Sequence, residues 1–203
     1  MKTQINIKSI LLHTICVAGT IFFASSCSEN KTTDSVEVAE EENISRLTND
    51  DETIVVIDND NGVKFLMAAA EIQLEEISLG KLAQEKGTNP HVKELGKMME
   101  VNHTKTLAEL NTLAQSKSVA IPATATEDSM ETQKDLMEKE GNDFGKAYSD
   151  MMVEHHEDAI ELFEKAATDS EDAEIKAWAA EKLPTMRTHL EHAKACKAEC
   201  DKL

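Results

Sequence analysis

The sequence predicts an all-α protein whose main domain is an antiparallel four-helix bundle. The 203 residues include only seven glycines and three prolines, the residues that most often interrupt helices. Aromatic residues make up 3% of the chain, and β-branched residues rarely alternate with polar ones, so no sheet is indicated. Instead, apolar residues recur every three or four positions in long segments, which is the period of an amphipathic helix.

The first 26 residues predict a lipoprotein signal peptide. Lys2 and Lys8 precede an apolar run at 10–23, which is shorter than the roughly 20 residues that a membrane-spanning helix needs. The run ends in 24–27, Ala-Ser-Ser-Cys, which resembles a bacterial lipobox. We therefore expect Cys27 to be the lipidated mature N-terminus, with an ordinary cleaved signal as the alternative.

This signal predicts a protein anchored in the cell envelope and facing the periplasm or the exterior. Whether the anchor lies in the inner or the outer membrane stays open. The next segment, 27–61, is acidic and polar, so we expect a disordered tether. Its one apolar run, 53–57, could form a short strand or pack on the bundle. The bundle domain is expected over 62–203.

Turn and capping residues divide this domain into helices. Gly87 is a good C-terminal residue for the first helix, and Pro90 suits the first turn of the second. Pro184 falls inside the last helix, where a kink is expected. The predicted helices cover 63–86, 90–116, 143–167 and 171–200, with a short helix at 129–139 in the long middle connection.

The charge of the chain excludes some partners. The formal net charge is −18 at pH 7, which would repel nucleic acid and anionic lipid headgroups. We expect no nucleic-acid partner, and membrane association only through the lipid anchor.

Four side chains are expected to face the bundle core, one from each long helix. His103 and His189 lie within apolar stripes, and Glu71 borders one. On the third helix His155 lies nearer the stripe, whereas the repeated spacing from a Met-Met pair favours His156. Counting from the hairpins puts Glu71 level with His103 but offsets His156 from His189 by roughly 9 Å.

These segments resemble the domain of unknown function 4142 family, exported bacterial proteins in the ferritin-like superfamily. The resemblance covers about 65–200 and implies a ferritin-like bundle, but it implies no reaction. The segment 151–163 also looks like the Met-His-His motif of a related exported family associated with copper. The motifs that carry the main resemblance are Ala70-Glu71, Met99 with His103, Met152 with His156, and Leu183-Pro184 with His189.

The sharpest functional hypothesis is a metal site with one ligand per helix, formed by Glu71, His103, His156 (or His155) and His189. Imidazole ligands suit copper, zinc or iron. The alternative is a metal-free envelope protein with a structural or protein-binding role, whose histidines bond to each other and to a buried Glu.

An enzyme is less expected. A ferritin-type di-iron oxidase needs Glu-x-x-His on two helices, and only Glu100 with His103 supplies it, since no acid stands three residues before His189.

Cys196 and Cys200 form a second candidate group at the end of the last helix. Their spacing puts both on one helical face, with His192 about a turn away. In an oxidising compartment we expect a disulfide, either within the chain or between two copies in a homodimer. The alternative is a soft metal bound by these three residues.

Overall fold

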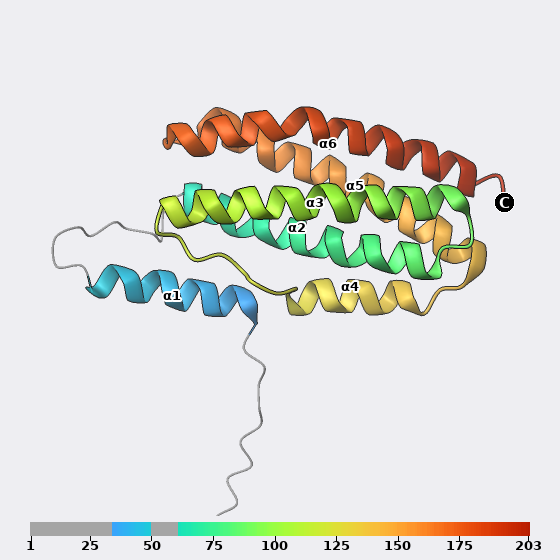
Figure 1. Cartoon of the computed structure of the whole chain (residues 1–203), viewed down its shortest axis with the longest axis horizontal. Helices are drawn as coiled ribbons and strands as arrows, with labels where there is room; N and C mark the ends of the chain where they lie inside the picture. The colour runs from blue at the N-terminus through green and yellow to red at the C-terminus, as the bar shows by residue number, and fades with distance from the viewer. Residues whose placement is uncertain (1–33, 50–60) are drawn as a thin grey trace, which may run out of the picture. The chain divides into compact units, whose positions relative to one another are not determined.

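A computed structural model describes residues 34–49 and 61–203, all within one compact unit, Thr33–Leu203. In these ranges the regular structure is entirely helical, so the predicted all-α class is confirmed (Figure 1). The signal peptide, Cys27 and the run at 53–57 lie outside the described residues. The helices are α1 (Ser35–Asn49), α2 (Asn61–Lys86), α3 (Pro90–Ser116), α4 (Glu127–Met137), α5 (Gly141–Asp169) and α6 (Ala173–Cys200).

Helices α2 and α3 form a closely packed hairpin. Its turn is stabilised by Asn89, whose side chain accepts a hydrogen bond from the His91 N–H (2.9 Å), with Pro90 in the first turn of α3. Two glycines then face each other, and a Cβ on Gly80 would lie 2.6 Å from the carbonyl oxygen of Gly96. The absence of side chains at these two positions lets the two backbones approach closely.

Helices α5 and α6 form the second hairpin. Asp172 caps α6, because its carboxylate accepts from the N–H groups of Glu174 (2.8 Å) and Ile175 (3.1 Å). Lys117, just after α3, forms an ion pair with Asp172 (2.7 Å) and so ties the two hairpins together. Helix α6 is continuous through Pro184. None of the helices in the described ranges is both long and apolar enough to cross a membrane.

The core of these four helices has two apolar clusters with a polar layer between them. Each helix contributes to both clusters, for example through Leu66 and Leu79 on α2 or Ala179 and Ala193 on α6. Apart from Ser149, which bonds to backbone carbonyls within α5, the buried polar residues of these four helices fall between those positions. They are Gln73 and Glu76 on α2, His103 on α3, His156 on α5 and His189 on α6.

The expectation of a tether over 27–61 is corrected for Ser35–Asn49, which forms α1 and packs on the connection after α3. Asn43 is 1% exposed, and its amide donates to the Ala120 carbonyl (2.9 Å) and accepts from the Ala120 N–H (2.6 Å). Arg46 donates to the Ser118 carbonyl (2.8 Å). The acidic composition concealed this helix because it docks through polar bonds and the small side chain of Ala39.

Replacing Asn43 with Ala is expected to release α1 from the domain. The variant leaves both backbone groups of Ala120 without their partner, a loss of about 1–3 kcal/mol for buried polar groups. Hydrogen exchange over 35–46 should then accelerate markedly. Glu41→Ala, at an exposed position of the same helix, is the control and should leave exchange unchanged. Equal exchange in both variants would contradict the proposed docking role of Asn43.

Candidate metal centre

Three histidines converge in the polar layer. His103 from α3, His156 from α5 and His189 from α6 are 3%, 1% and 2% exposed. Their ring centroids form a nearly equilateral triangle with sides of 5.6, 5.1 and 5.4 Å. One ring nitrogen from each lies within 4.8 Å of the other two. The structure therefore brings together the three histidines that the sequence selected, including His156 rather than His155.

The ring of His103 is oriented so that one of its nitrogens, Nε2, is unprotonated and has no hydrogen-bond partner among the described residues of the core. Gln73 donates its amide N–H to the Ala69 carbonyl (3.1 Å), so its oxygen is the atom that faces His103. That oxygen accepts from His103 Nδ1 (2.8 Å), which places the proton on Nδ1. His103 Nε2 then carries a lone pair, and it is among the buried atoms without a hydrogen-bond partner in the described residues.

His156 is oriented in the same way by its own helix. Its Nδ1–H donates to the Met152 carbonyl (2.8 Å), because a carbonyl can only accept, so Nε2 carries the lone pair. That nitrogen lies 3.4 Å from His189 Nδ1. A metal-binding histidine commonly donates its second nitrogen to a carbonyl or carboxylate in this manner.

The position of the ring proton of His189 depends on the orientation of the Asn102 amide. Asn102 Nδ2 lies 2.9 Å from His189 Nε2, so the amide donates there and His189 Nδ1–H points at His156 Nε2. Rotation of the Asn102 amide by 180° would place its oxygen at Nε2 instead. The proton of His189 would then sit on Nε2, and Nδ1 would be free to bind an ion.

Burial keeps two of these rings neutral. It lowers the pKa of His103 to about 4, with Glu76 opposing and His156 assisting the decrease. Burial, followed by the proximity of His103 and His156, lowers the pKa of His189 to about 3. Near pH 7 these imidazoles are therefore uncharged, the form that binds metals.

Glu76 is a functional candidate that the sequence analysis missed. It is 1% exposed, and its Oε1 accepts from His155 Nδ1 (3.3 Å), while Oε2 has no partner in the described residues. Burial alone would raise the pKa of Glu76, but the bond from His155 and the nearby His156 and His103 hold it below the usual value. The sequence alone did not single it out, because Glu75 and Glu76 are adjacent and Glu76 lies about 1.4 turns of helix beyond Glu71.

Glu71 does not join the three histidines. It is half-buried, and its pKa is raised first by burial and then by Asp34 and Asp128, which belong to the α1 and α4 side of the domain. The hairpin count that put Glu71 level with His103 was therefore right to within about two residues, about 3 Å along α2. Two residues also rotate a side chain by about 200° around the helix, so Gln73, not Glu71, contacts His103. The expected offset of His156 from His189 is also corrected, since their ring nitrogens are in contact.

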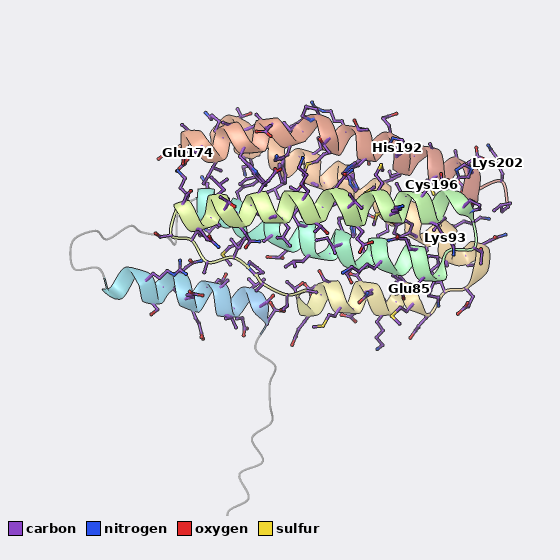
Figure 2. All side chains as sticks on the ribbon, in the orientation of Figure 1. Glu85, Lys93, Glu174, His192, Cys196 and Lys202 are labelled. Carbon is purple, nitrogen blue, oxygen red and sulfur yellow. The ribbon has the colours of Figure 1, made fainter. Side chains whose placement is uncertain are left out.

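The alternative metal ligands predicted from the sequence lie outside the histidine cluster. Glu100 accepts from the Gln84 amide (2.8 Å), and His192 is exposed on α6 (Figure 2). His155 is the partner of Glu76. None of these belongs to the metal-binding group found in the described residues, which consists of the three histidines.

Cys196 and Cys200 are buried free thiols, so the disulfide expected between them within the chain is not formed, and a cross-link between two copies stays a prediction. Residues four apart on a helix have Cβ atoms about 5–6 Å apart, too far for the 3.5–4.5 Å of a disulfide. Burial and the neighbouring Cys200 raise the pKa of the Cys196 thiol to about 12. Since the thiolate is the metal ligand, this thiol is also a poor one at neutral pH.

The cluster suits one transition metal ion. Imidazole nitrogens bind zinc at about 2.0–2.1 Å, which sets them about 3.3–3.5 Å apart in a tetrahedral site. The 3.4 Å pair His156–His189 has this spacing, and His103 presents the bare third nitrogen. Three histidines without a carboxylate do not supply the paired glutamates of a ferritin-type di-iron site, so the oxidase alternative gains no support.

Comparison with known proteins gives one match. The family model described as "Domain of unknown function (DUF4142)" matches residues 58–196, which confirms the resemblance found in the sequence. No curated protein and no solved structure matches the chain.

Proposed function

The chain belongs to the DUF4142 family, and from its buried histidine cluster we propose that it binds a single transition metal ion inside a ferritin-like four-helix bundle. The bundle is formed by α2, α3, α5 and α6, and lipid on Cys27 holds it at a membrane of the cell envelope. The His103 Nε2 lone pair, buried and without a partner, is the observation that carries the proposal.

The energetics of buried polar groups support this proposal. A buried nitrogen without a partner costs about 1–3 kcal/mol. Here the surroundings preserve that nitrogen, because Gln73 and Ala69 fix the ring of His103 with its lone pair directed away from them. A core evolved only for packing would gain more from an apolar residue at this position.

The proposed role is binding rather than catalysis. His103, His156 and His189 hold the ion through one nitrogen each, Gln73 and the Met152 carbonyl orient two of the rings, and apolar clusters on both sides exclude water. Support for the envelope location comes from the lipobox-like 24–27 and the apolar run before it.

A metal-free role is the competing function, favoured by the contact between His156 and His189. In that case His189 Nδ1–H donates to His156 Nε2 (3.4 Å), and the cluster serves to align α5 with α6. The protein would then act in the envelope through its surface.

Metal binding distinguishes the two functions. The purified, metal-depleted protein is expected to take up about one equivalent of Zn(II), Cu(I) or Fe(II). At a free concentration 100 times Kd, the ion should stabilise the fold by about 2.7 kcal/mol, because it binds only the native state. Elemental analysis and thermal unfolding with each ion measure both effects.

The matched variant is His103→Ala/His156→Ala/His189→Ala, which should show neither uptake nor a shift in the unfolding midpoint. His91→Ala/His192→Ala, at exposed positions, should behave as the parent. Parent protein that stays metal-free and unshifted with all three ions would overturn the proposal and favour the metal-free role.

A further inference from the structure

The carboxylate of Glu76 lies at the height of the histidine cluster, and we propose that it is the charge partner of the bound ion and shifts the selectivity of the centre towards divalent cations. This inference rests on the metal-binding function proposed above. It assigns Glu76 a role that neither the family description nor the histidine group provides.

One hydrogen bond and one shared helix face place Glu76 near the cluster. On α2, Glu76 follows Gln73 by three residues, so both side chains lie on the same face, and Gln73 bonds directly to His103. On α5, His155 bonds to Glu76 Oε1 and is the neighbour of His156 in the chain. The carboxylate is thus near enough for its charge to act on His103 and His156, although it lies outside the group of ring nitrogens within 4.8 Å of one another.

The second oxygen of the Glu76 carboxylate, Oε2, is one of several buried polar atoms that lack a hydrogen-bond partner in the part of the chain that the structure describes. Within the described residues, Glu76 Oε2, His103 Nε2 and the Tyr148 hydroxyl are all buried without hydrogen-bond partners. The charge of Glu76 acts on both His103 and Tyr148. His155 bonds only to Oε1, so Oε2 is a buried acceptor without a hydrogen bond from the described residues, which is unfavourable. A cation among the three neutral rings would stabilise it electrostatically.

The charge of the ion determines how much binding free energy Glu76 contributes. Coulomb attraction scales with the charge of the cation, so the same carboxylate contributes twice as much binding free energy to a divalent ion as to a monovalent one at the same position. Zn(II) therefore depends on Glu76 more strongly than Cu(I) does. A purely structural role of Glu76 would affect both ions equally.

The test compares Zn(II) and Cu(I) affinities of the full chain in detergent, by competition with chromophoric chelators. Glu76→Gln keeps the shape and the acceptor for His155 but removes the charge. It should lower Zn(II) affinity about 10–100-fold, the usual effect of a residue that supports metal ligands. Cu(I) affinity should fall only about 3–10-fold, because half the free energy is lost.

Glu71→Gln is the matched control, since it makes the same charge change on the same helix at a half-buried position away from the histidines. Both affinities should stay within about 2-fold of the parent, as solvent screens this charge. Glu76→Asp keeps the charge but withdraws it by one methylene. It should lower both affinities less than Glu76→Gln does, and the binding free energy lost should again be about twice as large for Zn(II) as for Cu(I). This variant serves as the test if Glu76→Gln does not fold.

The possible outcomes distinguish a failure of the proposed role of Glu76 from a failure of the metal-binding function itself. Equal losses for Zn(II) and Cu(I), or unchanged affinities in Glu76→Gln, overturn the role of Glu76 while the metal site stands. A parent protein that binds neither ion overturns both. A Zn(II) loss that exceeds the Cu(I) loss in Glu76→Gln or Glu76→Asp, with Glu71→Gln unchanged, supports the role of Glu76.

Discussion

Acidification of the metal-free protein from pH 6.5 to pH 5 is expected to remove about 3 kcal/mol of stability through His103 and His189 alone. Their folded-state pKa values, about 4 and about 3, lie below the ordinary value of 6.5. Between pH 6.5 and about 4, these two histidines are therefore protonated in the unfolded chain but remain largely neutral in the folded protein. Each histidine then lowers the free energy of unfolding, with a slope that increases from about 0.7 kcal/mol per pH unit at pH 6.5 to about 1.4 kcal/mol per pH unit near pH 5.

Other groups around the cluster titrate as well. From α2, the pKa of Glu76 is lowered, so its contribution is lost as the pH falls through that depressed value. From α5, burial opposes protonation of His155, but its bond to Glu76 raises its pKa overall, which favours the folded state at mildly acidic pH. The expected effect is therefore the difference between the parent and a variant that lacks only the two depressed histidines.

The variant is His103→Gln/His189→Gln, which keeps polar side chains but cannot take up protons in this range. Urea unfolding at pH 6.5, 5.75 and 5, with a chelator present, should show a larger loss of unfolding free energy in the parent, by about 2 kcal/mol per pH unit on average for the two groups. Parallel losses in the two proteins would show that the rings are not held neutral by burial. Added metal should protect the parent, because bound nitrogens cannot accept protons.

Gly80→Ala is expected to destabilise the fold by about 3 kcal/mol, at the upper end of overpacking effects. The new Cβ would lie 2.6 Å from the Gly96 carbonyl oxygen and 2.9 Å from the Glu100 nitrogen. Both are backbone atoms of α3, so neither can rotate away. In an exposed helix the same change would stabilise by about 1 kcal/mol, which makes a loss a specific sign of the close approach.

Gly145→Ala is the matched control. Its Cβ would contact the Cys200 sulfur and a methyl group of Val92 at 3.3 Å, and such side-chain ends can adjust. Thermal unfolding should show a change within about 1 kcal/mol for this variant. Gly80→Ala should also weaken metal binding, since α2 carries Gln73 and Glu76 to the cluster. Equal stabilities of the two variants would contradict the packing role of Gly80.

The sequence determined the helices well because their signals are local. Apolar period, the cap at Asn89 and the glycine at 87 depend on neighbours within a few residues, and the observed bounds of α2 and α3 agree with the predicted ones within two residues. Helix α1 was missed for the opposite reason, as its docking depends on Ala120, which lies 77 residues from Asn43.

By itself, the sequence determined the all-α class, the family, and two of the three histidines that face the core, His103 and His189, whereas the choice of His156 over His155 required the structure. The tertiary structure alone decided which carboxylate accompanies them and at what height they meet. Glu71 and Glu76 lie about 140° apart around α2. Only the packing of α2 against α3 and α5 shows that Gln73 and Glu76 are on the face that contacts His103 and His155. Helical periodicity fixes the direction of a side chain, whereas the relative height of two helices is set by contacts such as Gly80 with Gly96, which no local pattern contains.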